Sequence, residues 1–68
     1  MLERSKTGTY LLRDGSEFDY NGISYSETGE LILLGTRVYT DGYRKNFRFY
    51  SEKQLSMKMR MWGAKYLY

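Results

Sequence analysis

The chain has no cysteine, no histidine and no proline among its 68 residues. Without cysteine it cannot form a disulfide, and without cysteine and histidine it cannot build the usual structural zinc sites. The same two absences remove the side chains that most often act as nucleophile or general base near neutral pH. We therefore expect a protein that is not an enzyme and that has no catalytic, metal-binding or cofactor-binding residues.

Long apolar runs are also missing. No stretch approaches the roughly 18 residues needed to span a bilayer, and no apolar signal-peptide core follows Met1. A chain without cysteine fits a reducing compartment. These features predict a protein with no membrane association and a cytoplasmic location.

The length leaves room for a single domain, residues 1–68. A chain this short lies near the lower limit at which a hydrophobic core outweighs conformational entropy. Eight tyrosines, three phenylalanines and one tryptophan favour dense aromatic packing as the source of stability. We expect either a marginally stable monomer or a homodimer.

Charge is divided unevenly along the chain. Residues 36–68 carry eight lysines and arginines but only two acidic residues, whereas residues 1–35 carry three basic and six acidic ones. A molecule polarised in this way orients toward an oppositely charged partner, because the field at a surface depends on local charge. The functional surface is therefore expected in the second half.

Turn signals divide the first two-thirds of the chain into strands. Asp14-Gly15, Asn21-Gly22 and Asp41-Gly42 are typical of two-residue type I′ hairpin loops, and Gly29 adds a looser turn. These signals predict an antiparallel meander with strands at residues 7–13, 16–20, 22–26, 30–40 and 43–50.

The period of the pattern changes after Tyr50. Ser51 and Gln54 form a capping box, and the apolar residues Leu55, Met59, Trp62 and Tyr66 follow at helical spacing. The spacing predicts a helix over residues 52–62, after which Gly63 either lets residues 64–68 form a tail or strand or allows the helix to fray further. The predicted fold class is α+β, a small curved antiparallel β-meander of four or five strands with one C-terminal helix on its apolar face.

Two-residue loops would fix which side chains share a face. They set Leu11 opposite Phe18, Thr36 opposite Phe47 and Leu34 opposite Phe49, all toward the core. The reverse face of the second hairpin then collects the candidate partner-binding residues Arg37, Tyr39, Arg44, Arg48 and Tyr50.

Such a face suits an acidic protein surface, because guanidinium groups pair with carboxylates. Nucleic acid is the alternative partner, since the same arginines would contact phosphates and the tyrosines would stack on bases. The protein partner is preferred because no nucleic-acid-binding motif is recognisable. An ordinary solvated face, in which arginines protect an edge strand from pairing, is the non-functional interpretation.

The predicted helix carries a second apolar stripe that includes Met57 and Met61. A methionine-rich face is typical of an adaptable partner surface, and these two residues complete the predicted binding set. Alternatively, the chain folds back after Gly63 and covers them with Tyr66 and Tyr68. A homo-oligomeric assembly subunit held together by this stripe is a further functional alternative.

The segment Tyr50-Ser51-Glu52-Lys53-Gln54-Leu55, continuing to Gly63, resembles the ends of many short uncharacterised bacteriophage open reading frames. Those proteins run from a final strand through Tyr-Ser-x-Lys-Glu-Ala into one amphipathic helix, and this chain departs from that pattern at Gln54 and Leu55. The resemblance covers about the last quarter of the chain. It implies a viral accessory protein that binds a host protein in the host cytoplasm as a regulator or inhibitor, and it supplies no active-site residues.

Overall fold

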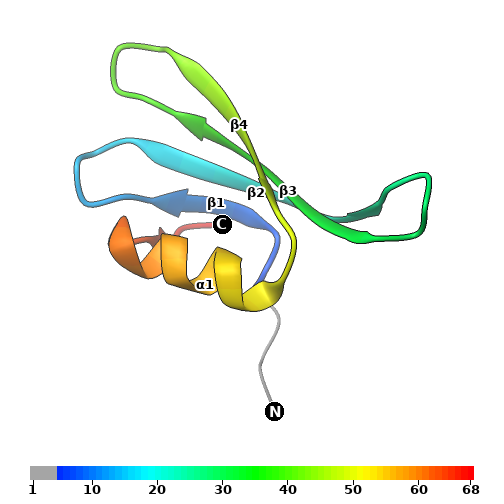
Figure 1. Ribbon diagram of the computed structural model, residues 1–68. Helices are drawn as coiled ribbons and strands as arrows, with labels where there is room; N and C mark the ends of the chain where they lie inside the picture. The colour runs from blue at the N-terminus through cyan, green and yellow to red at the C-terminus, as the bar shows by residue number, and fades with distance from the viewer. Residues whose placement is uncertain (1–4) are drawn as a thin grey trace.

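A computed structural model describes residues 5–68. Five antiparallel strands form one sheet in the order β4-β3-β2-β1-β5, and a single helix crosses one of its faces (Figure 1). The predicted α+β fold class is confirmed. The elements are β1 (Gly8–Leu11), β2 (Glu17–Tyr25), β3 (Leu31–Val38), β4 (Arg44–Phe49), α1 (Glu52–Met61) and β5 (Lys65–Tyr66).

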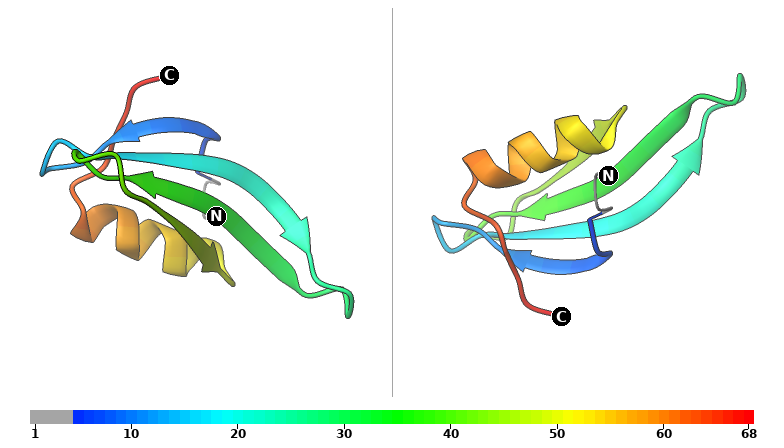
Figure 2. Two further views of the ribbon diagram at one scale, coloured as in Figure 1. Left: turned by 90° about the horizontal axis from the view of Figure 1, so that it is seen from above. Right: turned by 90° about the horizontal axis from the view of Figure 1, so that it is seen from below.

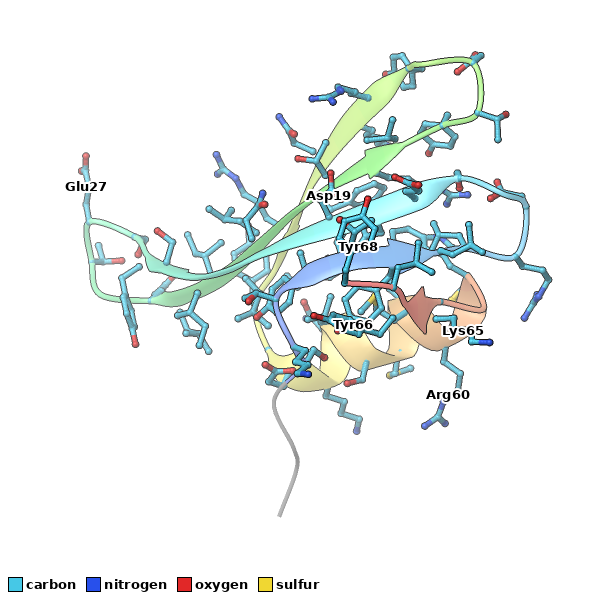
Figure 3. All side chains as sticks on the ribbon, turned by 180° about the vertical axis from the view of Figure 1, so that it is seen from behind. Asp19, Glu27, Arg60, Lys65, Tyr66 and Tyr68 are labelled. Carbon is cyan, nitrogen blue, oxygen red and sulfur yellow. The ribbon has the colours of Figure 1, made fainter. Side chains whose placement is uncertain are left out.

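The sheet is strongly curved, and the helix lies on one side of it (Figure 2). We call the side that contacts α1 the inner face and the opposite side the outer face. The β2–β3 hairpin extends beyond the other strands as an arm (Figure 1), and Glu27 lies at its tip (Figure 3).

The three hairpin loops share one form, a type I turn followed by a left-handed glycine. Aspartates favour this form in two of the loops, because the carboxylates of Asp14 and Asp41 accept hydrogen bonds from the main-chain N–H groups of Ser16 and Tyr43. The glycines that end the loops have φ between 84° and 90°. Main-chain hydrogen bonds close the loops between Leu12 and Ser16, Ser26 and Glu30, and Tyr39 and Tyr43.

This loop form overturns the predicted registers. The loops at Asp14-Gly15 and Asp41-Gly42 each contain three residues instead of the predicted two, so the partner of each paired residue moves by one. Phe18 lies opposite Tyr10 and not Leu11, and Phe47 lies opposite Gly35 and not Thr36. Because side chains alternate between faces, Tyr10 replaces Leu11 in the core.

The Asn21-Gly22 hairpin prediction was also wrong. β2 runs through this dipeptide and pairs with β3 on both sides of a bulge between Tyr20 and Gly22. Gly22 has a φ of 105°, so the left-handed tolerance of glycine bends one strand here instead of reversing the chain. The continuous strand gains pairing with β3 along its whole length.

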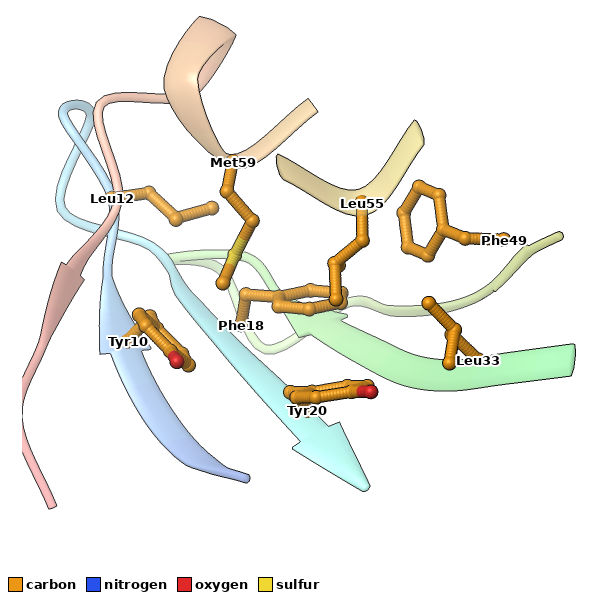
Figure 4. Close-up of a cluster of buried hydrophobic side chains, with 8 residues drawn as sticks. All are labelled: Tyr10, Leu12, Phe18, Tyr20, Leu33, Phe49, Leu55 and Met59. Atoms are coloured by element: carbon orange, nitrogen blue, oxygen red, sulfur yellow. The ribbon is translucent and has the colours of Figure 1, made fainter. Parts of the chain in front are cut away.

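The core centres on Phe18, whose side chain is fully buried between the sheet and α1 (Figure 4). Its ring contacts those of Phe49 and Trp62, with centroids 6.2 and 5.3 Å away. Leu55 is also fully buried and fixes the helix to the sheet. The buried cluster consists of Tyr10, Leu12, Phe18, Tyr20, Leu33, Phe49, Leu55 and Met59.

Both ends of the helix follow the sequence signals. The Ser51 hydroxyl accepts a hydrogen bond from the N–H of Gln54 at 3.1 Å. At the other end, Gly63 adopts a φ of 66°, and the N–H of Ala64 donates to the carbonyl of Met59 in a Schellman arrangement. The predicted helix over residues 52–62 is confirmed except at its last residue, Trp62, which is the C-cap.

The open question of residues 64–68 resolves in favour of a strand. β5 pairs with β1 at the edge of the sheet, with Tyr66 opposite Tyr10 and Lys65 opposite Leu11. The rings of Tyr10 and Tyr66 meet edge to face, with centroids 5.2 Å apart. Tyr66 therefore covers β1 (Figure 3), not the methionines of the helix.

Candidate partner-binding surface

Arg37 does not lie with the other predicted arginines. It faces inward opposite Phe18, and its side chain is only 13% exposed. The guanidinium forms an ion pair with Asp14 at 2.8 Å and lies over the Trp62 ring, 4.8 Å from its centroid. Arg37 therefore links the β1–β2 loop to the end of the helix, and the prediction that it shares a face with Arg44 and Arg48 was wrong.

Arg44 and Arg48 lie on the outer face. They flank Asn46, whose side-chain oxygen accepts a hydrogen bond from the Thr36 hydroxyl at 2.9 Å across β3 and β4. Both arginines are exposed. Four residues of extended chain separate them by about 13 Å, so the two guanidinium groups mark the ends of one row.

The predicted tyrosines are divided between two places. The Tyr39 ring packs at a tilt of 39° against the Tyr43 ring, with centroids 5.6 Å apart, and the Arg37 guanidinium lies 4.6 Å from the Tyr39 ring centroid. Tyr50 is 56% exposed at the junction of β4 and α1, where its N–H donates to Gln54. The structure thus separates Tyr39 from the arginine row.

Met57 and Met61 are both exposed, by 58% and 67%. They border a groove of about 300 Å³ that lies between the helix and the end of β4. The groove is lined by Phe49, Gln54, Met57, Lys58 and Met61. Since the chain beyond Gly63 runs to β1, the alternative in which Tyr66 and Tyr68 cover these methionines was wrong.

The main-chain edge of β4 was not part of the predicted binding set, which consisted of side chains only. β4 is the edge strand of the sheet: one side of β4 pairs with β3, and no described strand pairs with its other side. The Tyr39 N–H donates to the Tyr43 carbonyl, and bonded pairs alternate along an antiparallel ladder. The N–H and C=O groups of Arg44, Asn46 and Arg48 therefore point away from β3 toward the open side.

Three features meet along this edge. We define the β4 edge surface as the outer row of arginines, the open main chain of β4 and the methionine-lined groove. The Nζ of Lys45, on the inner side, lies 5.3 Å from the centroid of the Phe47 ring. The surface comprises Arg44, Lys45, Asn46, Arg48, Met57, Lys58 and Met61.

The cations of the β4 edge surface form no ion pair within 4.0 Å among the described residues, and Glu17 is the nearest acidic residue across the outer face, one strand beyond Val38, the partner of Arg44. Among residues 5–68, the one pair of opposite charges with a nitrogen-to-oxygen distance of 4.0 Å or less is Arg37 and Asp14. No carboxylate of residues 5–68 thus lies within that distance of the cations of β4 or of Lys58. Their charge is available to a partner.

Asp14 is the carboxylate whose ionisation the fold favours. Hydrogen bonds from the Ser16 hydroxyl and N–H, together with the Arg37 guanidinium, hold the pKa of Asp14 below its ordinary value. A lowered pKa in the folded state means that the unfolded chain binds more protons in acid. The resulting stabilisation is present above about pH 4, the ordinary range of aspartate, and is lost as the pH falls through the folded-state pKa.

We therefore expect Asp14→Asn to lower the urea midpoint at pH 6. The difference in urea midpoint between the wild type and this variant should become smaller as the pH falls to 3. Asp41→Asn is the matched control, because Asp41 occupies the same loop position but has no arginine beside it. It should lower the midpoint at pH 6 by less. A difference between wild type and Asp14→Asn that stays constant from pH 6 to pH 3 would contradict the assignment.

Comparisons of the chain with protein-family models, curated proteins and solved structures found no match. The described residues contain no group of three or more acidic side chains placed to hold a metal ion. No helix in residues 5–68 is both long enough and apolar enough to cross a bilayer.

Proposed function

We propose that this protein is a non-enzymatic binding protein that recognises an acidic surface of another protein through its β4 edge surface. The observation that supports the proposal is the placement of Arg44, Lys45 and Arg48, which have no carboxylate within 4.0 Å among residues 5–68, on a strand whose outer side pairs with no described strand. Cations that lie together on one edge attract an acidic partner and orient it.

The composition of the surface favours a protein partner over nucleic acid. Binding of single strands relies on aromatic rings that stack on bases between cationic groups. On the outer face, Arg44 and Arg48 pair with Val38 and Leu34, so no ring lies between the two arginines, and the exposed rings of Tyr43 and Tyr50 lie beyond the two ends of β4. The groove beside the helix is apolar and methionine-lined, which suits the side chains of a protein.

The resemblance of the C-terminal quarter to short bacteriophage reading frames adds a biological setting to this proposal. We propose that the partner is a host protein, that binding takes place in the host cytoplasm, and that the protein acts as a regulator or inhibitor. Binding that occupies a surface of the partner is sufficient for inhibition, and the proposal requires no catalytic residue.

Capture from a host extract with nuclease treatment tests the partner class. A nuclease-resistant protein should be retained by the wild type, and Arg44→Glu/Arg48→Glu should weaken its affinity at least ~10-fold, because close interfacial charge pairs contribute about 1.5 kcal/mol or more. The matched control is Lys53→Glu/Arg60→Glu, which makes the same charge change on the helix, outside the β4 edge surface. It should weaken binding much less.

Two outcomes would contradict the proposal. Equal losses from both double variants would mean that net charge, not the β4 edge surface, determines binding. Loss of all retained material after nuclease treatment, with log affinity falling by about 0.7 to 0.9 per phosphate contacted for each log unit of salt, would assign the surface to nucleic acid.

A further inference from the structure

The open edge of β4 offers a specific kind of contact. Arg44, Asn46 and Arg48 direct their main-chain donors and acceptors away from β3, and no described strand pairs with them. An extended segment of another chain can satisfy these groups by adding one more strand to the sheet. This contact depends on main-chain geometry and leaves the side chains of the added strand to determine specificity.

The two sides of such an added strand would meet different surroundings. Side chains on the outer face would lie beside Arg44 and Arg48, which carry positive charge. Side chains on the inner face would lie toward the groove that Met57 and Met61 border. Because successive side chains of a strand point to opposite faces, the best occupant alternates acidic and apolar residues.

Charge also disfavours a second copy of the chain as the occupant. An antiparallel pairing of β4 with itself, centred on Asn46, would set Arg44 of one copy directly opposite Arg48 of the other. Like charges directly opposite each other in a sheet are destabilising. The edge is therefore protected against its own copy but open to an acidic strand.

We infer that β4 binds an extended segment of the partner protein by strand addition, and that this segment alternates acidic and apolar residues. The inference rests on the proposed function and specifies how the same surface is used. Acidic side chains of the segment pair with Arg44 and Arg48, and its apolar side chains enter the groove beside Met57 and Met61.

A synthetic peptide tests the inference without knowledge of the partner. The probe is an end-capped peptide of about nine residues that alternates glutamate and valine, and the control has the same composition with its glutamates and valines in separate blocks. Both peptides carry the same charge. The alternating peptide should bind at least ~10-fold tighter, and it should protect the amides of Arg44, Asn46 and Arg48 from hydrogen exchange.

Removal of a main-chain donor on either partner separates strand addition from charge attraction. On the peptide, N-methylation of alternate residues in one of the two possible sets should abolish binding to the wild-type protein. On the protein, Asn46→Pro removes an N–H that points to the open side, where proline is tolerated in an edge strand. It should lose peptide binding, whereas Asn46→Ala, which keeps the N–H, should retain it.

The failures are distinguishable. Equal binding of the alternating and block peptides would overturn strand addition and leave the proposed recognition of acidic proteins standing. Capture of a nuclease-resistant protein whose affinity is unchanged by Asn46→Pro would do the same. Protection of the Arg44 and Arg48 amides that rises with protein concentration in the absence of peptide would show self-pairing, and would overturn the inference in favour of a homodimer.

Discussion

Replacing Gly35 with alanine will remove much of the folded stability of this protein. A Cβ atom at this position would lie 2.1 Å from the Cζ atom of Phe18 and 2.7 Å from its Cε1 atom. The Phe18 ring cannot move aside, because Phe49 and Trp62 pack against it and its side chain is fully buried. Overpacking of a core typically costs about 1–3 kcal/mol, a large part of the stability of so small a domain.

Urea unfolding followed by circular dichroism measures this effect, and a double-mutant cycle identifies its cause. Phe18→Leu shortens the side chain that faces Gly35, so Gly35→Ala should cost much less in the Phe18→Leu background than in the wild type. Residues in contact are expected to couple in this way. An equal cost in both backgrounds would show that the close approach of Phe18 is not the reason for glycine at position 35.

The second large effect is expected at Leu55. Leu55→Ala removes a fully buried side chain that fixes α1 to the sheet, and such truncations cost about 2–5 kcal/mol. Met57→Ala truncates a side chain of similar size two residues further along the same helix, but Met57 is 58% exposed. It should change stability by no more than about 0.5 kcal/mol. Urea midpoints of the two variants provide the comparison.

The same pair of variants tests the β4 edge surface from the side of stability. Met57→Ala should leave the free energy of unfolding nearly unchanged and weaken binding of the alternating peptide. A loss of stability as large as that of Leu55→Ala would mean that Met57 is part of the core. The groove would then be packed in solution and unavailable to a partner.

The helix could be predicted from the sequence because its signals are local. Each signal acts on main-chain or side-chain groups only a few residues away. Ser51 caps the start of the helix, Leu55 and Met59 are buried on one side of it, and Gly63 follows its C-cap. The class of the fold followed from the same kind of signal. Asp-Gly dipeptides reverse a chain in loops of two or three residues, so the turns at Asp14-Gly15 and Asp41-Gly42 were located correctly, whereas their predicted length of two residues was wrong.

A difference of one residue in the length of the hairpin loop decided on which face of the sheet Arg37 lies. The two-residue loop sent Arg37 outward with Arg44, whereas the three-residue loop sends it inward over Trp62. A hydrophobic pattern would not place arginine there. Its partner Asp14 comes from another hairpin, 23 residues away in the chain, so only the tertiary fold brings the two together.

The sequence allowed β4 to be an edge strand, but whether another strand covers it depends on the order of the strands. β5 consists of only Lys65 and Tyr66, too short for any periodic signal, yet it occupies the side of β1 and leaves β4 at the opposite end of the sheet. The row of cations was visible in the sequence. The main-chain groups between them became part of the site only once the strand order was known.

The placement of β5 makes the C-terminal end of the sequence a suitable attachment site. The Tyr68 carbonyl accepts a hydrogen bond from the N–H of Thr9, so anything joined after Tyr68 departs on the β1 side, with the width of the sheet between it and β4. A fluorophore or a surface tether at that end would therefore not obstruct β4. Molecules immobilised through it would all present β4 to the solution, which suits single-molecule and sensor measurements of binding.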